Sequence, residues 1–102
     1  MKMVFPCKLI AEEVGGYSVI FPDIAGGTQG ETLYEALEMA EALVGFMLTS
    51  LEEGEEIPEP TPLEKVEVEK GSFVTLIKVD TAEYLQKEAA RQAEMQKSEG
   101  AA

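Results

Sequence analysis

The sequence predicts one small α+β domain with the element order β-β-β-α-β-α, in which one long helix packs on a face of a small antiparallel or mixed sheet. Three observations indicate this fold. Apolar residues alternate with other residues over much of positions 3–30, which is typical of strands separated by glycine turns. A helical apolar repeat then spans residues 30–54. Finally, a β-branched run over residues 73–79 leads into a second helical pattern.

The first strand is predicted over residues 3–11, where apolar side chains fall on both faces. One face carries Met3, Phe5, Cys7 and Leu9, and the other carries Val4 and Ile10. Such a strand is expected to be largely covered on both faces. Pro6 conflicts with this position because it lacks the N–H that donates a ladder hydrogen bond. We therefore expect a bulge or a locally unpaired neighbour at Pro6.

Two further strands follow. Gly15 and Gly16 form a two-residue hairpin signal, because both positions of a primed turn require positive φ. The second strand is predicted over residues 17–21, and Pro22 ends it. Residues 23–30 hold three glycines and are expected to form a tight loop and a short third strand around Thr28.

Residues 30–54 carry the most complete helical signal. Thr32 is suited to the N-cap, Glu35 completes a capping box, and Gly54 is suited to end the helix. The apolar stripe comprises Leu33, Leu37, Ala40, Leu43, Met47 and Leu51, widened by Ala36, Val44 and Leu48. We expect the buried side to run along Leu37, Leu43, Met47 and Leu51.

A proline-rich connector follows the helix. Pro58, Pro60 and Pro62 predict an extended, semi-rigid chain, and Val66 and Val68 predict a short exposed strand. Residues 52–69 hold eight glutamates against one lysine, the densest charge in the sequence. Most such runs are solvated surface, and a specific electrostatic contact is the alternative.

The last predicted strand spans residues 73–79, and Asp80 is expected to cap a second helix with Glu83 three residues later. The narrow apolar stripe of that helix comprises Ala82, Leu85, Ala89 and Ala93. It is expected to fade into a frayed tail, KSEGAA. We therefore predict a single domain over residues 1–87, with residues 88–102 forming a helix end and tail and no separate domain.

Composition excludes several classes of function. The 20 acidic and 8 basic residues give a net charge of −12, which disfavours nucleic acid and anionic membranes and favours a basic partner. Histidine is absent, so His-based catalysis and the commonest metal ligand are absent too. Cys7 is the single cysteine, which favours a reducing, cytoplasmic location. We expect no cofactor, no metal and no membrane span.

The strand over residues 73–79 is apolar on both faces, and one helix layer covers only one of them. The uncovered face or edge is an aggregation hazard unless a second copy pairs with it. We therefore expect a homo-oligomer, with Phe73, Thr75, Leu76 and Ile77 as interface candidates.

The order of motifs resembles the HicB antitoxin family. The resemblance rests on Gly16-Tyr-Ser-Val-Ile-Phe21, Pro22-Asp23, Thr28-Gln-Gly30, Thr32-Leu33 with Glu35-Ala-Leu37 and Ala40, and Val79-Asp80 with Tyr84-Leu85. It covers residues 3–87. It implies a degraded ribonuclease H-like fold and a chain that neutralises a small basic ribonuclease of the HicA type.

Two departures from the family pattern stand out. The loop that usually has a proline before its glycine reads Ala25-Gly26-Gly27 here. Only residues 88–102 follow the last match, where family members usually continue into a DNA-binding domain. We therefore expect this chain not to bind DNA by itself.

Three functions remain open at this point. The first is an antitoxin-like protein that covers the RNA-binding face of a basic toxin. The second is an orphan relative that acts as an oligomeric structural or regulatory protein with another partner. The third is a residual metal-dependent nuclease using Asp23 and Glu35. The first strand supplies no further carboxylate, so these two residues are better explained as a turn and a cap, and we expect no enzyme.

The predicted partner-binding site lies at the sheet end formed by residues 21–31. Its glycines allow close backbone approach, and its carboxylates can meet Lys or Arg of a basic protein. The site comprises Phe21, Pro22, Asp23, Gly27, Gln29, Gly30 and Glu31.

Overall fold

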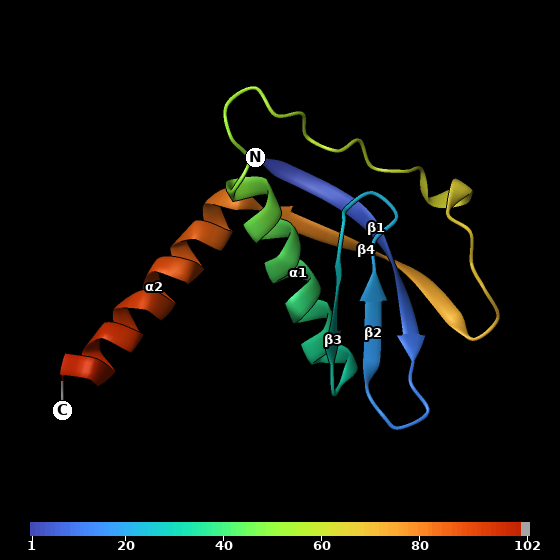
Figure 1. Cartoon of the computed structure of the whole chain (residues 1–102), viewed down its shortest axis with the longest axis horizontal. Coiled ribbons are helices and arrows are strands. Elements are labelled where there is room, and N and C mark those ends of the chain that lie inside the picture. Colours follow the sequence, from blue (N-terminus) through green and yellow to red (C-terminus); the bar gives the residue numbers. More distant parts are fainter. Residues whose placement is uncertain (101–102) are drawn as a thin grey trace.

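The computed structural model describes the backbone of residues 1–100 and the side chains of residues 1–96. It confirms the α+β fold and the β-β-β-α-β-α order (Figure 1). The elements are β1 (Lys2–Ala11), β2 (Tyr17–Ile20), β3 (Gly27–Gly30), α1 (Leu33–Thr49), the 3₁₀ turn η1 (Leu63–Lys65), β4 (Ser72–Asp80) and α2 (Thr81–Gly100).

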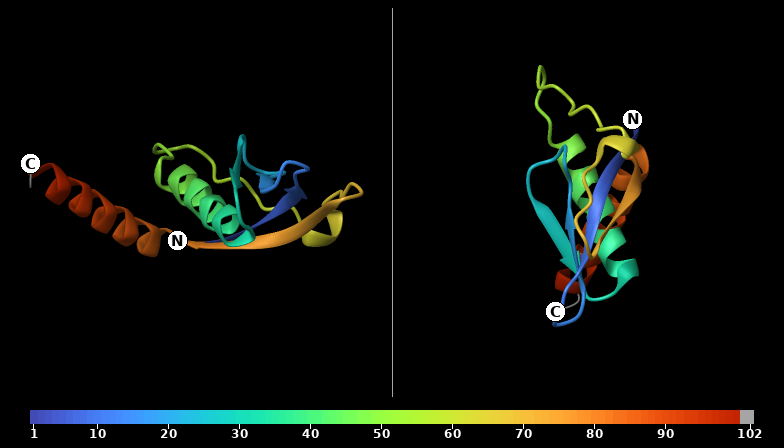
Figure 2. Two further views of the ribbon diagram at one scale, coloured as in Figure 1. Left: turned by 90° about the horizontal axis from the view of Figure 1, so that it is seen from below. Right: turned by 90° about the vertical axis from the view of Figure 1, so that its right-hand side faces the viewer.

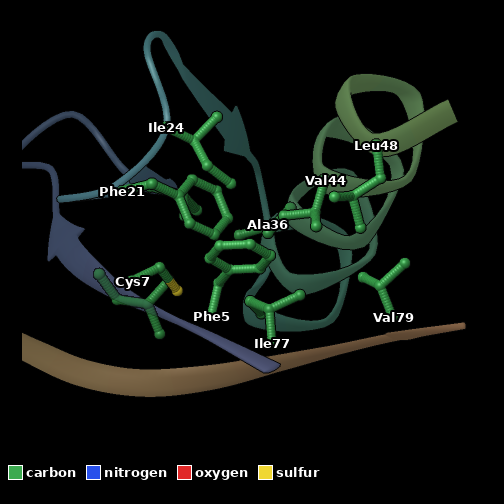
Figure 3. Packing of buried hydrophobic residues seen from close by; sticks show 12 residues of the cluster. Phe5, Cys7, Phe21, Ile24, Ala36, Val44, Leu48, Ile77 and Val79 are labelled. Atoms are coloured by element: carbon green, nitrogen blue, oxygen red, sulfur yellow. The ribbon is translucent and has the colours of Figure 1, made fainter. Parts of the chain in front are cut away.

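The four strands form one antiparallel sheet in the order β3-β2-β1-β4. The register places Leu9 opposite Val19 and Phe5 opposite Ile77, so the odd-numbered residues of β1, β2 and β4 share one face. α1 lies against this face, and Figure 3 shows Phe5 and Phe21 between the strands and the helix. The buried core comprises Phe5, Cys7, Leu9, Val19, Phe21, Ile24, Ala36, Ala40, Val44, Leu48, Ile77 and Val79.

Pro6 is accommodated without a bulge. The pairing of β1 with β4 is continuous from Lys2 to Ile10, and the pairing with β2 begins only at Lys8. Thr81 donates its N–H to the Met1 carbonyl in the same register, and hydrogen-bonded pairs alternate along an antiparallel ladder. Pro6 and Leu76 are therefore a non-hydrogen-bonded pair, and the missing N–H of Pro6 points to the side where β2 has already ended. The expected locally unpaired neighbour is confirmed.

The long helix is shorter than predicted, and a different side of it faces the sheet. It ends at Thr49, whose hydroxyl donates to the Gly45 and Phe46 carbonyls, and Gly54 lies in a later turn with φ +92°. Its fully buried row comprises Ala36, Ala40, Val44 and Leu48. The row expected to be buried, Leu37, Leu43, Met47 and Leu51, is only partly buried at the flank of the core. The Thr32 N-cap is confirmed by its bond from the Glu35 N–H.

The connector and α2 also differ from the expectation. Val66 and Val68 form no strand, and η1 is the only regular element described between α1 and β4. α2 extends to Gly100, into the segment predicted to fray, while residues 101–102 lie outside the described chain. Figures 1 and 2 show α2 leaving the end of β4 and running away from the sheet. The predicted stripe of Ala82, Leu85, Ala89 and Ala93 is exposed, and Tyr84 packs instead on Gly45 of α1.

Candidate partner-binding surface

The loop between β2 and β3 is anchored by two apolar side chains. Phe21 and Ile24 are buried in the core beneath α1 (Figure 3). Pro22 and Ala25 between and after them are exposed, and Gly26 adopts a positive φ of 93° that favours glycine. The loop therefore has a fixed base and an exposed tip, although Phe21 itself is not available to a partner.

Asp23 ties the connector to this loop. One carboxylate oxygen accepts the Thr61 N–H at 2.9 Å, and the other accepts the Thr61 hydroxyl. Asp23 is half-buried, and both of its oxygens are used inside the chain. That Asp23 contacts a partner stays a prediction, but the structure gives its carboxylate an internal role that would compete with such a contact. The sequence predicts a turn at Asp23 and does not indicate a bond to Thr61, 38 residues away.

The remaining predicted site residues divide into exposed and interior positions. Gly27, Gln29 and Glu31 are exposed, and the Glu31 N–H donates to Glu35 at 3.4 Å. Gly30 is buried, because a Cβ there would lie 2.3 Å from the backbone nitrogen of Ala36. Gly30 therefore allows close packing of β3 on the start of α1 and offers no surface.

An apolar groove lies beside the loop, which the sequence did not reveal. It has a volume of about 340 Å³ and runs between the tip of the loop, the second half of α1 and the start of the connector. Phe46 stands at this groove with 62% of its surface exposed. The lining residues are Ile24, Ala25, Leu43, Phe46, Met47, Ser50, Leu51 and Glu55. Their positions in three separate segments explain why no local sequence pattern identified them.

One glutamate, Glu55, lines this groove at the start of the connector. All eight glutamates of residues 52–69 are exposed. Within the described chain only Glu69 among them forms an ion pair, with Lys8 at 3.2 Å. The glutamates nearest to α1 are therefore free of internal cations in the part of the chain that the structure describes. The surface here thus combines an apolar groove with exposed acidic side chains of the connector.

The residues predicted for the oligomer interface lie along β4, an edge strand. Ile77 is buried beneath α1 and belongs to the core, and Thr75 is half-buried. Phe73 and Leu76 are 63% and 49% exposed on opposite faces of the strand. The strand thus offers two large exposed apolar side chains and a free edge.

The chemistry of the described residues is limited. Among them, no group of three or more His, Cys, Asp and Glu side chains is placed to hold a metal ion. No helix in the described part combines the length and apolar character that a membrane span requires. Cys7 is buried in the core, and this burial raises the pKa of its thiol from 9.0 to about 11. The thiol therefore stays protonated and unreactive near neutral pH.

The buried thiol predicts a pH-dependent loss of stability. Because the folded pKa lies above the unfolded one, the folded state holds the proton more tightly. This contribution is fully present below pH 9 and is lost as the pH rises through 11. Between pH 8 and pH 11 the free energy of unfolding should fall by about 2 kcal/mol more in the parent than in Cys7→Ala. Urea unfolding of both proteins at pH 8 and pH 11 measures the difference, and equal losses would contradict the assignment to Cys7.

Comparison with known proteins agrees with the fold and identifies a family. Residues 5–95 match the model of a family described as the HicB-like antitoxin of bacterial toxin–antitoxin systems. The chain is 48% identical over 63 residues to Antitoxin HicB 1 of Photorhabdus laumondii subsp. laumondii. This match covers 60% of the chain and spans 41% of the length of that relative.

A solved structure gives the same architecture. The fold matches a chain of a toxin–antitoxin complex from Streptococcus pneumoniae with a TM-score of 0.73 and 25% sequence identity. The match covers 82% of this chain and 73% of the other. With the family match extending over residues 5–95, the chain belongs to the HicB-like antitoxin family of bacterial toxin–antitoxin systems.

Proposed function

We propose that this chain binds a small basic ribonuclease of the HicA type and inhibits it by covering its RNA-binding face. The chain itself supplies no catalysis, metal or cofactor in this proposal. Family membership supports the antitoxin role, and the fold shared with a solved toxin–antitoxin complex supports a protein partner. The observation that carries the proposal is the apolar groove with the exposed Glu55 at its edge, at the start of the glutamate-rich connector.

The groove and the exposed tip of the loop together form the proposed contact surface. In this proposal Phe46, which lines the groove, lies at the centre of the contact surface. We assign it this role because large aromatic side chains in apolar surroundings contribute most to the affinity of protein interfaces. Glu55 at the groove and Glu31 at the start of α1 meet the partner's Lys and Arg side chains. Pro22, Gly27 and Gln29 complete the surface, while Phe21, Asp23 and Gly30 hold its shape from within.

Charge governs how fast the complex forms. A net charge of −12 attracts a basic protein over distances comparable to the Debye length, which is about 8–10 Å at physiological salt. Added salt therefore slows association steeply and weakens the final complex less, because the centre of the interface is apolar.

The test uses the basic protein encoded beside this chain, co-expressed and purified with it. Phe46→Asp should weaken the complex about thirtyfold or more by placing a charge at the apolar centre. Tyr34→Asp is the matched control, since Tyr34 is also an exposed aromatic residue of α1, at 78%, and does not line the groove. Affinity at two salt concentrations and protection of cells from the toxin are the readouts.

The possible results distinguish a wrong contact surface from a wrong function. If Phe46→Asp protects cells as well as the parent does, the contact surface lies elsewhere, and the glutamates of residues 52–69 are the next surface to test. If the parent forms no complex with the neighbouring protein, the antitoxin proposal itself fails. Replacing Asp23 would be a poor test, because it also releases Thr61 and the connector.

We further propose that the chain acts in the cytoplasm as a homo-oligomer. The single free cysteine fits a reducing compartment, and the exposed edge and apolar residues of β4 favour self-association. Sedimentation as a monomer at micromolar concentration would overturn the oligomer.

A further inference from the structure

The outer edge of β4 presents a row of unpaired backbone groups. The sheet order makes β4 an edge strand over its full length. Because Thr81 donates to Met1, the odd-numbered residues of β4 point their N–H and C=O groups toward β1. The groups of the even-numbered residues point outward, and these residues are Ser72, Val74, Leu76, Lys78 and Asp80. Within the described chain the Ser72 N–H donates to the Glu69 carbonyl at 3.0 Å, and no such bond is found for the outward backbone groups of Val74, Leu76 and Lys78.

We propose that β4 pairs with β4 of a second copy, antiparallel and about a twofold axis at Leu76. This register rests on the self-association proposed above and specifies its interface. Leu76 is the midpoint of the strand Ser72–Asp80, so this register overlaps the two strands completely. It also satisfies the outward groups from Val74 to Lys78 on both copies, because even-numbered residues then face even-numbered residues as hydrogen-bonded pairs. A continuous sheet across two copies results.

The side chains on the face away from α1 are compatible with this register. Leu76 lies opposite Leu76 of the second copy, so two exposed apolar side chains cover each other. Lys78 lies opposite Val74, and Asp80 lies opposite Ser72, whose hydroxyl donates to the Glu69 carbonyl of its own chain. No like charges face each other. A shift of the axis to Lys78 would place two lysines opposite each other, which disfavours that register.

The same pairing also covers side chains of β4 on the face of the sheet that carries α1. The axis at Leu76 places Phe73 opposite Val79 of the second copy, and Thr75 opposite Ile77. Val79 and Ile77 are buried in the core, whereas Phe73 is 63% exposed at the end of the strand. The pairing therefore places Phe73 beside the apolar core of the second copy and accounts for a large aromatic residue at an exposed strand end.

A second copy fits this edge better than a basic partner does. Lys78 and Asp80 are the charged residues of β4, and their charges cancel, so the edge exerts little attraction on a cationic protein. The exposed glutamates lie mainly on the connector and α1. α2 leaves the end of the strand and runs away from the sheet, so it does not follow this edge (Figures 1 and 2).

Cysteine cross-linking tests the register. In Leu76→Cys the two thiols lie on hydrogen-bonded opposite residues with Cα atoms about 5.5 Å apart, within the range for a disulfide. Lys78→Cys is the matched control on the same face, because in this register its two copies lie about 14 Å apart along the strands. Under mild oxidation Leu76→Cys should form covalent dimers at least about tenfold faster than Lys78→Cys. The parent protein is the negative control, because its single cysteine, Cys7, is buried and should not cross-link.

A charge variant tests the interface by a second route. Leu76→Lys places like charges opposite each other at a position that is exposed in the single chain, so the fold should survive. It also lowers the net negative charge, so weaker association cannot come from general repulsion. Val14→Lys, at a residue that is 99% exposed in the β1–β2 turn, adds the same charge away from β4. The dissociation constant measured by sedimentation should rise at least about tenfold for Leu76→Lys and stay unchanged for Val14→Lys.

The possible results are distinguishable. If the parent is a monomer, the proposed self-association fails and this register fails with it. If the parent is oligomeric, but the two cysteine variants cross-link at equal rates or Leu76→Lys associates like the parent, only the β4 pairing is overturned. Neither result affects the toxin-binding proposal, which is measured at Phe46 with a different protein.

Discussion

Replacing Val44 with aspartate is expected to unfold the domain. Val44 is fully buried in the middle of α1, against the apolar face of the sheet (Figure 3). An unpaired carboxylate there loses its hydration and finds no partner, because no polar or charged residue of the described chain is buried in the core. The cost is several kcal/mol, comparable to the ~5–15 kcal/mol that stabilise a small domain. Circular dichroism and thermal melting measure the loss.

The control is Tyr34→Asp on the same helix, which introduces the same charge at an exposed position. It should melt close to the parent. A Val44→Asp protein that melts with the parent would mean that this side of α1 does not face the sheet, and the core described above would be wrong.

Val44 shows what the helix pattern predicts and what it leaves open. The sequence predicts the helix, its N-cap and a broad apolar stripe, and these are confirmed. It does not predict the centre of the stripe, because that depends on the surface beneath the helix. Here small side chains at Ala36 and Ala40 let the helix approach the sheet closely, so the larger Leu37 and Leu43 move to the flanks.

The strands follow a similar logic. The alternation of apolar residues predicts β1, β2 and β4 correctly. Each of these strands pairs with a neighbouring strand, which fixes its exposed and its buried face. Val66 and Val68 alternate in the same way but form no strand, since the structure pairs no strand with them. Alternation alone identifies a strand only where a neighbour supplies the hydrogen bonds.

The candidate site is less predictable from sequence than the fold. The glycine-rich loop and the acidic connector are visible in the sequence, but the Asp23–Thr61 bonds join residues 38 positions apart. The groove likewise gathers Ile24, Phe46 and Leu51 from three segments. Such features depend on where the loop, the helix and the connector meet in space, and no local periodicity encodes that position.

Replacing Gly30 with alanine is the second substitution expected to have a large effect. The added Cβ would lie 2.3 Å from the backbone nitrogen of Ala36 and 2.7 Å from its Cα. Both are backbone atoms of α1 and cannot move aside as a flexible side chain can, so β3 and the start of α1 must separate. We expect the free energy of unfolding to fall by about 3 kcal/mol or more, at the upper end of overpacking costs.

Gln29→Ala on the same strand is the matched control, because Gln29 is exposed, and its free energy of unfolding should stay near that of the parent. Gly30 has no positive φ, so the alanine backbone is unstrained and the effect measures the steric contact alone. Urea unfolding of both variants gives the comparison. Equal stability would show that β3 does not pack this closely on α1. A loss confined to Gly30→Ala would confirm that this glycine is required for the close packing of β3 on the start of α1.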